Sequence, residues 1–198
     1  MKTLHYYFGL ISPWTYLGHD ELTRIVSENG VKVVFHPIQF GPVFAATGGL
    51  PVPKRSPQRQ AWRLAELRRW SARKGLDLNL QPAHFPVDES TAAKCVLALE
   101  AMGENPLGFM GRAHRVVWVE DRDLSDPAIV AELLRAEGFD AEDVMNRAQE
   151  DDVVQAYDGG PEQAIEAGVF GAPTFIVNEE LFWGQDRLDW VEEEIKSG

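Results

Sequence analysis

The sequence LHYYFGLISPWT, residues 4–15, decides the fold of this 198-residue chain. Residues 4–8 alternate in hydrophobicity with a period of two, which predicts a half-buried strand that ends before Gly9. Ser12-Pro13 predicts a helix start, because a serine oxygen can accept a free backbone N–H and proline has none to lose. Apolar residues then recur at helical spacing until Asn29-Gly30. The stretch therefore predicts a strand, a short loop and a helix.

The rest of the chain predicts a helical block between two sheet-forming ends. Strands are expected at residues 31–36, 174–177 and 181–183, and a closing helix carries Leu188, Val191 and Ile195 on its buried face. Frequent glycine and proline from about Pro37 predict a long loop. Helices are expected near 57–74, 89–102, 106–119, 127–137, 140–149 and 150–158. Gly159-Gly160-Pro161 should interrupt the last of these, and a short helix to Ala167 is expected to follow the interruption.

The composition limits the possible partners. Nineteen basic residues against 31 acidic ones give a net charge of −12, which disfavours nucleic acid and anionic membranes. An anionic ligand then needs a locally positive site. Lys54, Arg55 and Arg59 form a small basic cluster that is either such a site or a solvated loop.

The single cysteine, Cys95, cannot form an intrachain disulfide, and no apolar run approaches a membrane span. We therefore expect a cytoplasmic protein. Its five histidines are scattered and Cys95 has no partner at ligand spacing, so no metal site is indicated.

Several motifs in one order carry a family resemblance that covers nearly the whole chain. They occupy residues 12–17, 41–44, 47–48, 70–75, 84–86, 168–175 and 182–188. The sequence resembles the kappa-class glutathione transferases and, more closely, the bacterial 2-hydroxychromene-2-carboxylate isomerases. The resemblance implies an α/β, DsbA-like thioredoxin fold with a large all-helical insertion between its βαβ and ββα halves. Residues 1–40 and 168–198 would form the thioredoxin-like domain, and residues 41–167 the loop and helical insertion.

The resemblance assigns the catalytic role to Ser12, with Pro13 and Trp14 beside it in a glutathione site. A helix N-terminus stabilises an anion, and lowering a thiol pKa from its usual value to neutrality takes roughly 2 kcal/mol. We expect the Ser12 hydroxyl to donate a hydrogen bond to the glutathione thiolate, and not to act as a nucleophile. The alternative is that Ser12 only caps the helix.

The resemblance also makes Ala172-Pro173 a cis peptide bond, with the backbone of Ala172 paired to the cysteinyl part of glutathione. The alternative is an ordinary trans turn before a strand. Gln185 and Asp186 would bind the γ-glutamyl end, although Asp186 could also cap the last helix.

Two positions depart from the family pattern. Gly9 replaces a common aspartate, and Gly49 falls where the kappa enzymes have an asparagine that contacts glutathione. Gly49 is retained as a candidate cofactor contact, and one hydrogen bond to glutathione could be missing at this position.

The resemblance implies a homodimeric isomerase that uses glutathione as a cofactor. The thiolate would add to an unsaturated aromatic keto acid, the resulting single bond would rotate, and elimination would return glutathione. This mechanism requires an aromatic pocket that excludes water, and the candidate residues for its walls are Trp14, Phe40, Phe44 and Trp62. Three alternatives stay open: a conjugating transferase, a disulfide oxidoreductase, which would need cysteines where Ser12 and Thr15 stand, and a non-catalytic binding module.

Overall fold

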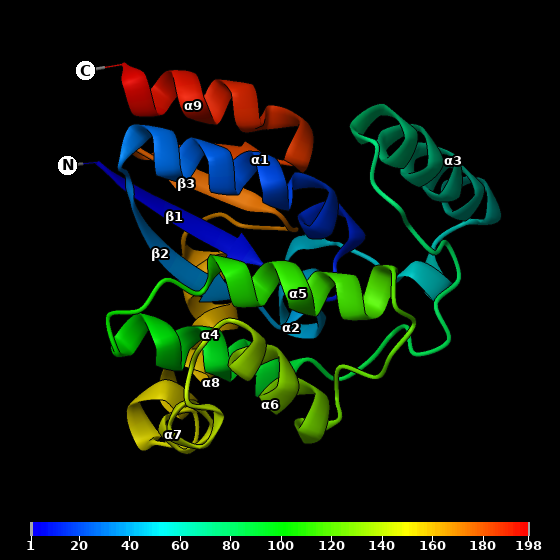
Figure 1. The fold of residues 1–198 in the computed structure, drawn as a ribbon. Coiled ribbons are helices and arrows are strands. Elements are labelled where there is room, and N and C mark those ends of the chain that lie inside the picture. Colours follow the sequence, from blue (N-terminus) through cyan, green and yellow to red (C-terminus); the bar gives the residue numbers. More distant parts are fainter. Residues whose placement is uncertain (1, 198) are drawn as a thin grey trace.

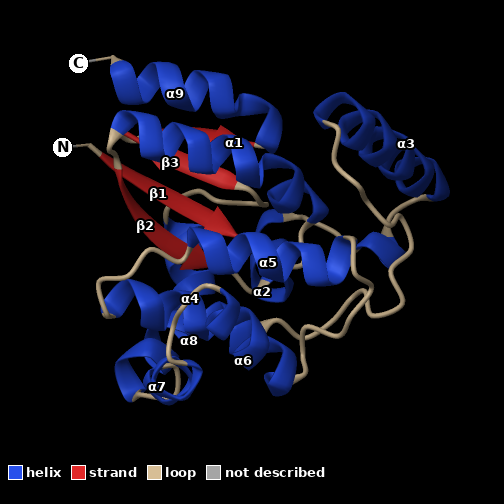
Figure 2. Cartoon of the chain, viewed as in Figure 1, coloured by secondary structure: helices blue, strands red, loops and turns tan. Residues whose placement is uncertain are grey.

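A computed structural model describes residues 2–197 and contains one four-stranded sheet in that part of the chain. The strands are β1 (Thr3–Phe8), β2 (Lys32–Pro37), β3 (Thr174–Val177) and β4 (Glu180–Trp183). Their spatial order is β2-β1-β3-β4. Figure 2 labels the first three of these strands, with β1 between β2 and β3. The β1–β2 pair is parallel and the other two pairs are antiparallel. The predicted strands are confirmed to within a residue of their ends.

Two helices cover one side of this sheet: α1 (Pro13–Asn29) and α9 (Leu188–Lys196) (Figure 1). Helix α1 begins where the sequence predicts, with the Ser12 side chain accepting a hydrogen bond from the Thr15 N–H and Pro13 in the first turn. It ends at Gly30, whose φ of 58° is the left-handed conformation that glycine adopts without steric cost.

The remaining helices lie between β2 and β3 in sequence. They are α2 (Phe40–Thr47), α3 (Pro57–Lys74), α4 (Ser90–Ala101), α5 (Leu107–Trp118), α6 (Pro127–Ala136), α7 (Ala141–Arg147) and α8 (Asp151–Glu166), with the 3₁₀ turn η1 (Val52–Lys54) between α2 and α3. A second 3₁₀ turn, η2 (Gln185–Arg187), lies between β4 and α9. Helices α4 and α8 pack against β2, whereas α3 contacts α1 and lies at the end of the molecule where α1 begins (Figure 1).

One apolar core joins the sheet to the inserted helices. Tyr6 and Phe175 stack within the sheet at 5.2 Å between ring centroids, and the same cluster includes Phe109 and Trp118 of α5, both fully buried. Burial of aromatic side chains of this size supplies much of a core's stabilisation. The division into residues 1–40 plus 168–198 and residues 41–167 stays a prediction.

The expected long loop after Pro37 contains a helix that the sequence analysis missed. Helix α2 begins at Phe40 and buries Val43 completely. Pro42 is in its first turn, where a backbone N–H has no partner in any helix, so this proline does not oppose helix formation. Gly48, with φ 79°, ends the helix.

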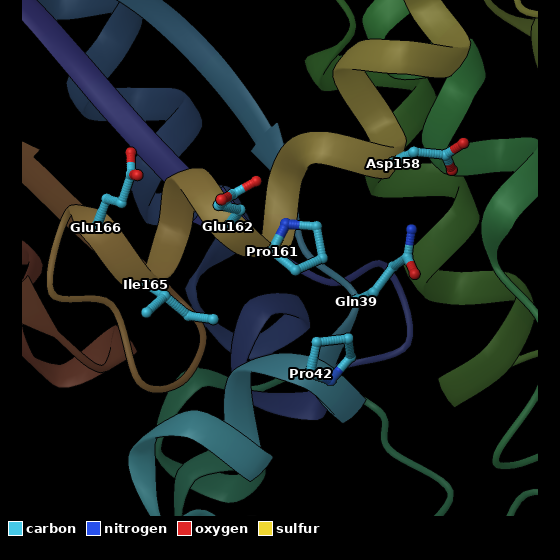
Figure 3. A pocket seen from close by; sticks show the side chains of 7 residues that line it. All are labelled: Gln39, Pro42, Asp158, Pro161, Glu162, Ile165 and Glu166. Carbon is cyan, nitrogen blue, oxygen red and sulfur yellow. The ribbon is translucent and has the colours of Figure 1, made fainter.

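The expected interruption at Gly159-Gly160-Pro161 is wrong, since α8 continues to Glu166 with Pro161 inside it. Proline at this position leaves the Tyr157 carbonyl without its usual helical donor. The side-chain amide of Gln39 donates to that carbonyl at 3.5 Å. Figure 3 shows Pro161 on α8 facing Gln39 and Pro42. Gly160 has no side chain where the chain approaches the Pro37 carbonyl, and a Cβ there would lie 3.0 Å from that oxygen.

Candidate active site

The two segments predicted to form the site are the loop after β1, which leads to Ser12, and the turn at Ala172-Pro173 before β3. They lie at the same end of these two central strands. In the antiparallel β1–β3 pair, Tyr7 is opposite Thr174. Tyr7–Thr174 is the last pair of that ladder. The same register, continued beyond it, would set Pro173 opposite Phe8 and Ala172 opposite Gly9, the residue that opens the loop to Ser12. The start of α1 and the turn before β3 thus come together, as the sequence analysis requires for one site.

Ser12 is 9% exposed and lies at the N-cap of α1. Its Oγ accepts a hydrogen bond from the Thr15 N–H at 3.3 Å, and its carbonyl accepts from the Tyr16 N–H at 3.0 Å. The Ser12 hydroxyl proton has no acceptor in the described part of the chain. Capping is confirmed, and it leaves the hydroxyl free to donate to a ligand.

The first turn of α1 offers further positive character. Pro13 carries no N–H, and the Trp14 N–H has no acceptor within residues 2–197. Free N–H groups at a helix N-terminus attract anions. Thr15 is fully buried and its hydroxyl oxygen has no hydrogen-bond partner in the same part of the structure.

The Ala172–Pro173 peptide bond is cis, as predicted. The Pro173 carbonyl accepts from the Gly184 N–H at 2.9 Å, and the Thr174 hydroxyl donates to the Gly171 carbonyl at 2.8 Å. Between them, the N–H and carbonyl of Ala172 form no hydrogen bond with any residue that the structure describes. The Ala172 backbone is therefore available to an extended peptide.

Two side chains from the helical insertion hold the loop that leads to Ser12. Glu89, the residue before α4, accepts a hydrogen bond from the Ile11 N–H at 2.9 Å. His114 of α5, fully buried, lies with Nδ1 2.8 Å from the Leu10 carbonyl oxygen and donates to it. Burial lowers the pKa of His114 to about 3, with His19 adding to the effect, so its ring is neutral near pH 7.

Glu89 is a site residue that sequence reasoning missed. Burial raises the pKa of its carboxyl group to about 7, against the opposing effect of the N–H groups of Ile11 and Leu10. Although Glu89 is at the N-cap of α4, its side chain makes no capping bond. Residues 88–90 have the composition of an ordinary helix start, so no local signal shows that Glu89 reaches the loop before Ser12.

The space beside Gly9 is already filled. A Cβ at Gly9 would lie 2.5 Å from the Phe40 ring and 3.1 Å from a Glu89 carboxylate oxygen. An aspartate at this position, which the resemblance leads us to expect, would overlap that ring. Glu89 instead supplies a carboxylate at this place.

Phe40 and Phe44 form an aromatic wall beside the loop, with ring centroids 5.4 Å apart. Gly49 lies directly against Phe44, since a Cβ there would be 2.3 Å from that ring. An asparagine cannot replace Gly49 unless Phe44 moves, and a ligand contact at Gly49 remains a prediction for its backbone. Trp62 of α3, another of the candidate wall residues, is 61% exposed.

Gln185 and Asp186 lie in η2, next to α1. Gln185 is 4% exposed, its Oε1 has no partner in the described residues, and its side chain packs against Gly18. Asp186 does not cap α9, and its carboxylate pairs with the Arg187 guanidinium at 3.1 Å. Their contact with a γ-glutamyl group stays a prediction.

Chemistry based on two cysteines is excluded at this site. The redox positions at the start of α1 are Ser12 and Thr15, and Cys95 is the single cysteine of the chain. Cys95 is fully buried in α4, and burial raises the pKa of its thiol to about 12. A thiol protonated at neutral pH is a poor nucleophile.

No group of three or more histidine, cysteine, aspartate or glutamate side chains within residues 2–197 could hold a metal ion. Over the same residues, no helix has the length and apolar character that crossing a membrane requires.

Comparison with known proteins defines the class to which this fold and site belong. Residues 3–196 match the family model described as the DSBA-like thioredoxin domain. The helix starting at Ser12 and the cis-proline turn are the parts of this fold in which the sequence analysis expects the active site. The chain belongs to the DsbA-like thioredoxin family, in its 2-hydroxychromene-2-carboxylate isomerase branch.

The assignment to this branch is supported by relatives that match the chain over nearly their whole length. The chain is 30% identical to the 2-hydroxychromene-2-carboxylate isomerase of Sphingobium xenophagum over 196 residues, 96% of each chain. It is 27% identical to the Pseudomonas putida isomerase of the same name, covering 94% of this chain and 91% of that one. A solved structure of a 2-hydroxychromene-2-carboxylate isomerase superposes with a TM-score of 0.80 at 25% identity, covering 98% and 94%.

A second solved structure shares the fold at lower identity. The cytosolic disulfide reductase DsbM from Pseudomonas aeruginosa, solved with GSH, superposes with a TM-score of 0.70 at 18% identity. It covers 98% of this chain and 99% of that one.

Proposed function

We propose that this enzyme is a glutathione-dependent isomerase of aromatic keto acids. It interconverts 2-hydroxychromene-2-carboxylate-type and trans-o-hydroxybenzylidenepyruvate-type compounds. The observation that carries the proposal is the start of α1, where the Ser12 hydroxyl proton and the Trp14 N–H are both free to donate. They lie at the sheet edge where Ala172 offers an unpaired backbone.

The donor set fits the thiolate of a cysteinyl peptide. A sulfur anion requires hydrogen-bond donors and a positive potential, which the Ser12 hydroxyl and the helix N-terminus supply. A peptide backbone requires a strand-like partner, which the N–H and carbonyl of Ala172 supply. When bound, glutathione supplies a thiolate that adds reversibly to a conjugated double bond, which lets that bond rotate before elimination.

The residues of this chain then have separate tasks. Ser12 holds the sulfur as an anion by donating its hydroxyl proton in a hydrogen bond. Glu89 and His114 fix the loop that presents Ser12, through the Ile11 N–H and the Leu10 carbonyl. Phe40 and Phe44 form an apolar wall, and exclusion of water strengthens each of these electrostatic contacts.

The test is isomerisation of trans-o-hydroxybenzylidenepyruvate, followed by its ultraviolet spectrum, with glutathione at a small fraction of the substrate concentration. The proposal predicts many turnovers per glutathione and full recovery of free thiol at the end. Stoichiometric loss of thiol would identify a conjugating transferase. Turnover that is equally fast without any thiol would exclude glutathione as the cofactor.

We also propose that the enzyme is a homodimer in a reducing cytoplasm. The free, buried thiol of Cys95 supports the compartment. Light scattering of the purified protein at micromolar concentration tests the dimer, and a mass equal to the 22.2 kDa chain would contradict it.

A further inference from the structure

Arg63 on α3 is a mostly buried cation without a counter-ion among the described residues. The residue is 7% exposed, and its side chain forms no hydrogen bond and no ion pair with any residue between 2 and 197. Burying an unpaired guanidinium is unfavourable, and buried arginines are normally paired with carboxylates. Arg24, Arg112 and Arg147 of this same chain each form an ion pair with at least one carboxylate. The isolation of Arg63 therefore requires an explanation.

The charged neighbours of Arg63 repel it. Burial lowers the pKa of Arg63 to about 10, and the nearby Arg55 guanidinium contributes in the same direction. Arg55 has its own pKa lowered by burial and by Arg59. No carboxylate takes part in either effect, in a chain with 31 acidic residues. Arg63 is still protonated at neutral pH, so these side chains create a locally positive site.

The geometry around Arg63 leaves its hydrogen-bonding edge available. Its guanidinium carbon lies 5.8 Å from the centroid of the Phe85 ring, which covers one face of the cation. Phe85 in turn packs against Trp118 at 5.0 Å between ring centroids. None of the guanidinium nitrogens is among the fully buried polar atoms that lack a hydrogen-bond partner. Because these nitrogens have no partner in the described residues, they retain contact with solvent. The N–H groups, which lie in the plane of the guanidinium, can therefore receive a ligand.

Arg63 lies on the side of α3 that faces the rest of the molecule. Leu67, one turn further along, is fully buried, and α3 packs against α1. Figure 1 shows α3 at the end of the molecule where α1 begins. Ser12 is the N-cap of α1 and therefore lies at this end. Phe85 is also close in sequence to Glu89, which contacts Ile11 in the loop before Ser12.

We propose that Arg63, assisted by Arg55, binds a carboxylate group of an organic anion held in the Ser12 site. A guanidinium edge matches a carboxylate in a bidentate pair, which lysine cannot reproduce. The proposal rests on the proposed function for the identity of that anion. The carboxylate belongs either to the aromatic substrate or to glutathione, and binding measurements distinguish the two sources.

The test compares Arg63→Met with Arg68→Met. Arg68 is on the same helix, is exposed and forms no ion pair with the described residues, so both variants remove one charge from α3. Calorimetry measures the Kd of salicylate and of uncharged salicylamide, then of glutathione and of glutathione with its glycyl carboxylate amidated. Arg63→Lys keeps the charge without the bidentate edge. Melting temperatures without ligand show whether each variant folds.

We expect Arg63→Met to weaken salicylate or glutathione at least tenfold relative to Arg68→Met, with no effect on the matching amide. The carboxylate that loses affinity identifies the source. Without ligand, Arg63→Met should melt at or above the wild-type temperature, because an unpaired buried charge has been removed. If Arg63→Met is unfolded, Arg63→Lys is measured in its place, and a tenfold loss of affinity for the carboxylate ligand in that variant supports the proposal. Equal affinities in the Arg63 and Arg68 variants, or no binding of either carboxylate to wild type, would overturn the proposal. Salicylate binding that requires Arg63 in a protein that does not bind glutathione would leave the anion site standing and refute the proposed function.

Discussion

The Glu89 carboxylate accepts a hydrogen bond at 2.9 Å from the backbone N–H of Ile11, 78 residues away in sequence and directly before Ser12. A side chain of the helical insertion therefore holds the loop that presents the candidate catalytic residue. Because this carboxyl group has a raised pKa of about 7, its ionisation occurs near neutral pH.

Glu89 makes stability depend on pH. The pKa of Glu89 in the native state is about 7, above the usual glutamate value of 4.5, so between these values the native state binds a proton that the unfolded state has released. Stability from this group is complete below pH 4.5 and is lost as pH rises through 7. Glu89→Gln, which keeps an acceptor for Ile11, should remove this loss and stabilise the protein at pH 8 by up to about 3 kcal/mol.

Urea denaturation at several pH values between 5 and 8 measures this effect. Glu193→Gln is the control, since Glu193 is an exposed carboxylate of α9. Asp88 and Tyr157 are the charged and titratable groups that interact with Glu89, and both are unchanged in the variant. The same pH slope in Glu89→Gln and wild type would show that Glu89 does not titrate in this range.

Gln39 should stabilise α8 only because Pro161 is present. Its amide donates to the Tyr157 carbonyl at 3.5 Å, which the proline leaves without a helical donor. We expect Gln39→Ala to lower the free energy of unfolding by about 0.5–1 kcal/mol. The loss should disappear in a Pro161→Ala background, where an N–H is restored at position 161. A double-mutant cycle in urea measures the coupling, and equal costs in both backgrounds would refute it.

Gly9 should not tolerate a side chain. A Cβ would lie 2.5 Å from the Phe40 ring, so Gly9→Ala should destabilise the protein by about 1–3 kcal/mol. Phe40→Leu should restore part of that loss when the two changes are combined. Gly41→Ala is a suitable control, because nothing lies within 4 Å of a Cβ there. Thermal unfolding that is unaffected by Gly9→Ala would mean that the Phe40 ring moves away without cost.

The parts of this structure that could be predicted from the sequence are those determined by neighbouring residues or by a family motif. Capping by Ser12 followed from its sequence neighbours, and the cis bond at Pro173 from the family motif around it. The reach of Glu89 to Ile11 could not be predicted, because the contact is formed only when α4 packs beside the sheet. Pro161 shows the opposite case, in which a correct local rule failed since Gln39, distant in sequence, satisfied the freed carbonyl.

The central claim is that Ser12 and the start of α1 stabilise a glutathione thiolate. It is tested most directly by calorimetric titration of glutathione into wild type and Ser12→Ala, with the pKa of the bound thiol followed by the ultraviolet absorbance of the thiolate. Ser27→Ala, an exposed serine of the same helix, is the control. We expect the bound thiol pKa to be well below its usual value of about 8.5 in wild type and to rise by about 1 unit or more in Ser12→Ala. An unshifted pKa in wild type, or the same lowered pKa in Ser12→Ala, would contradict the account.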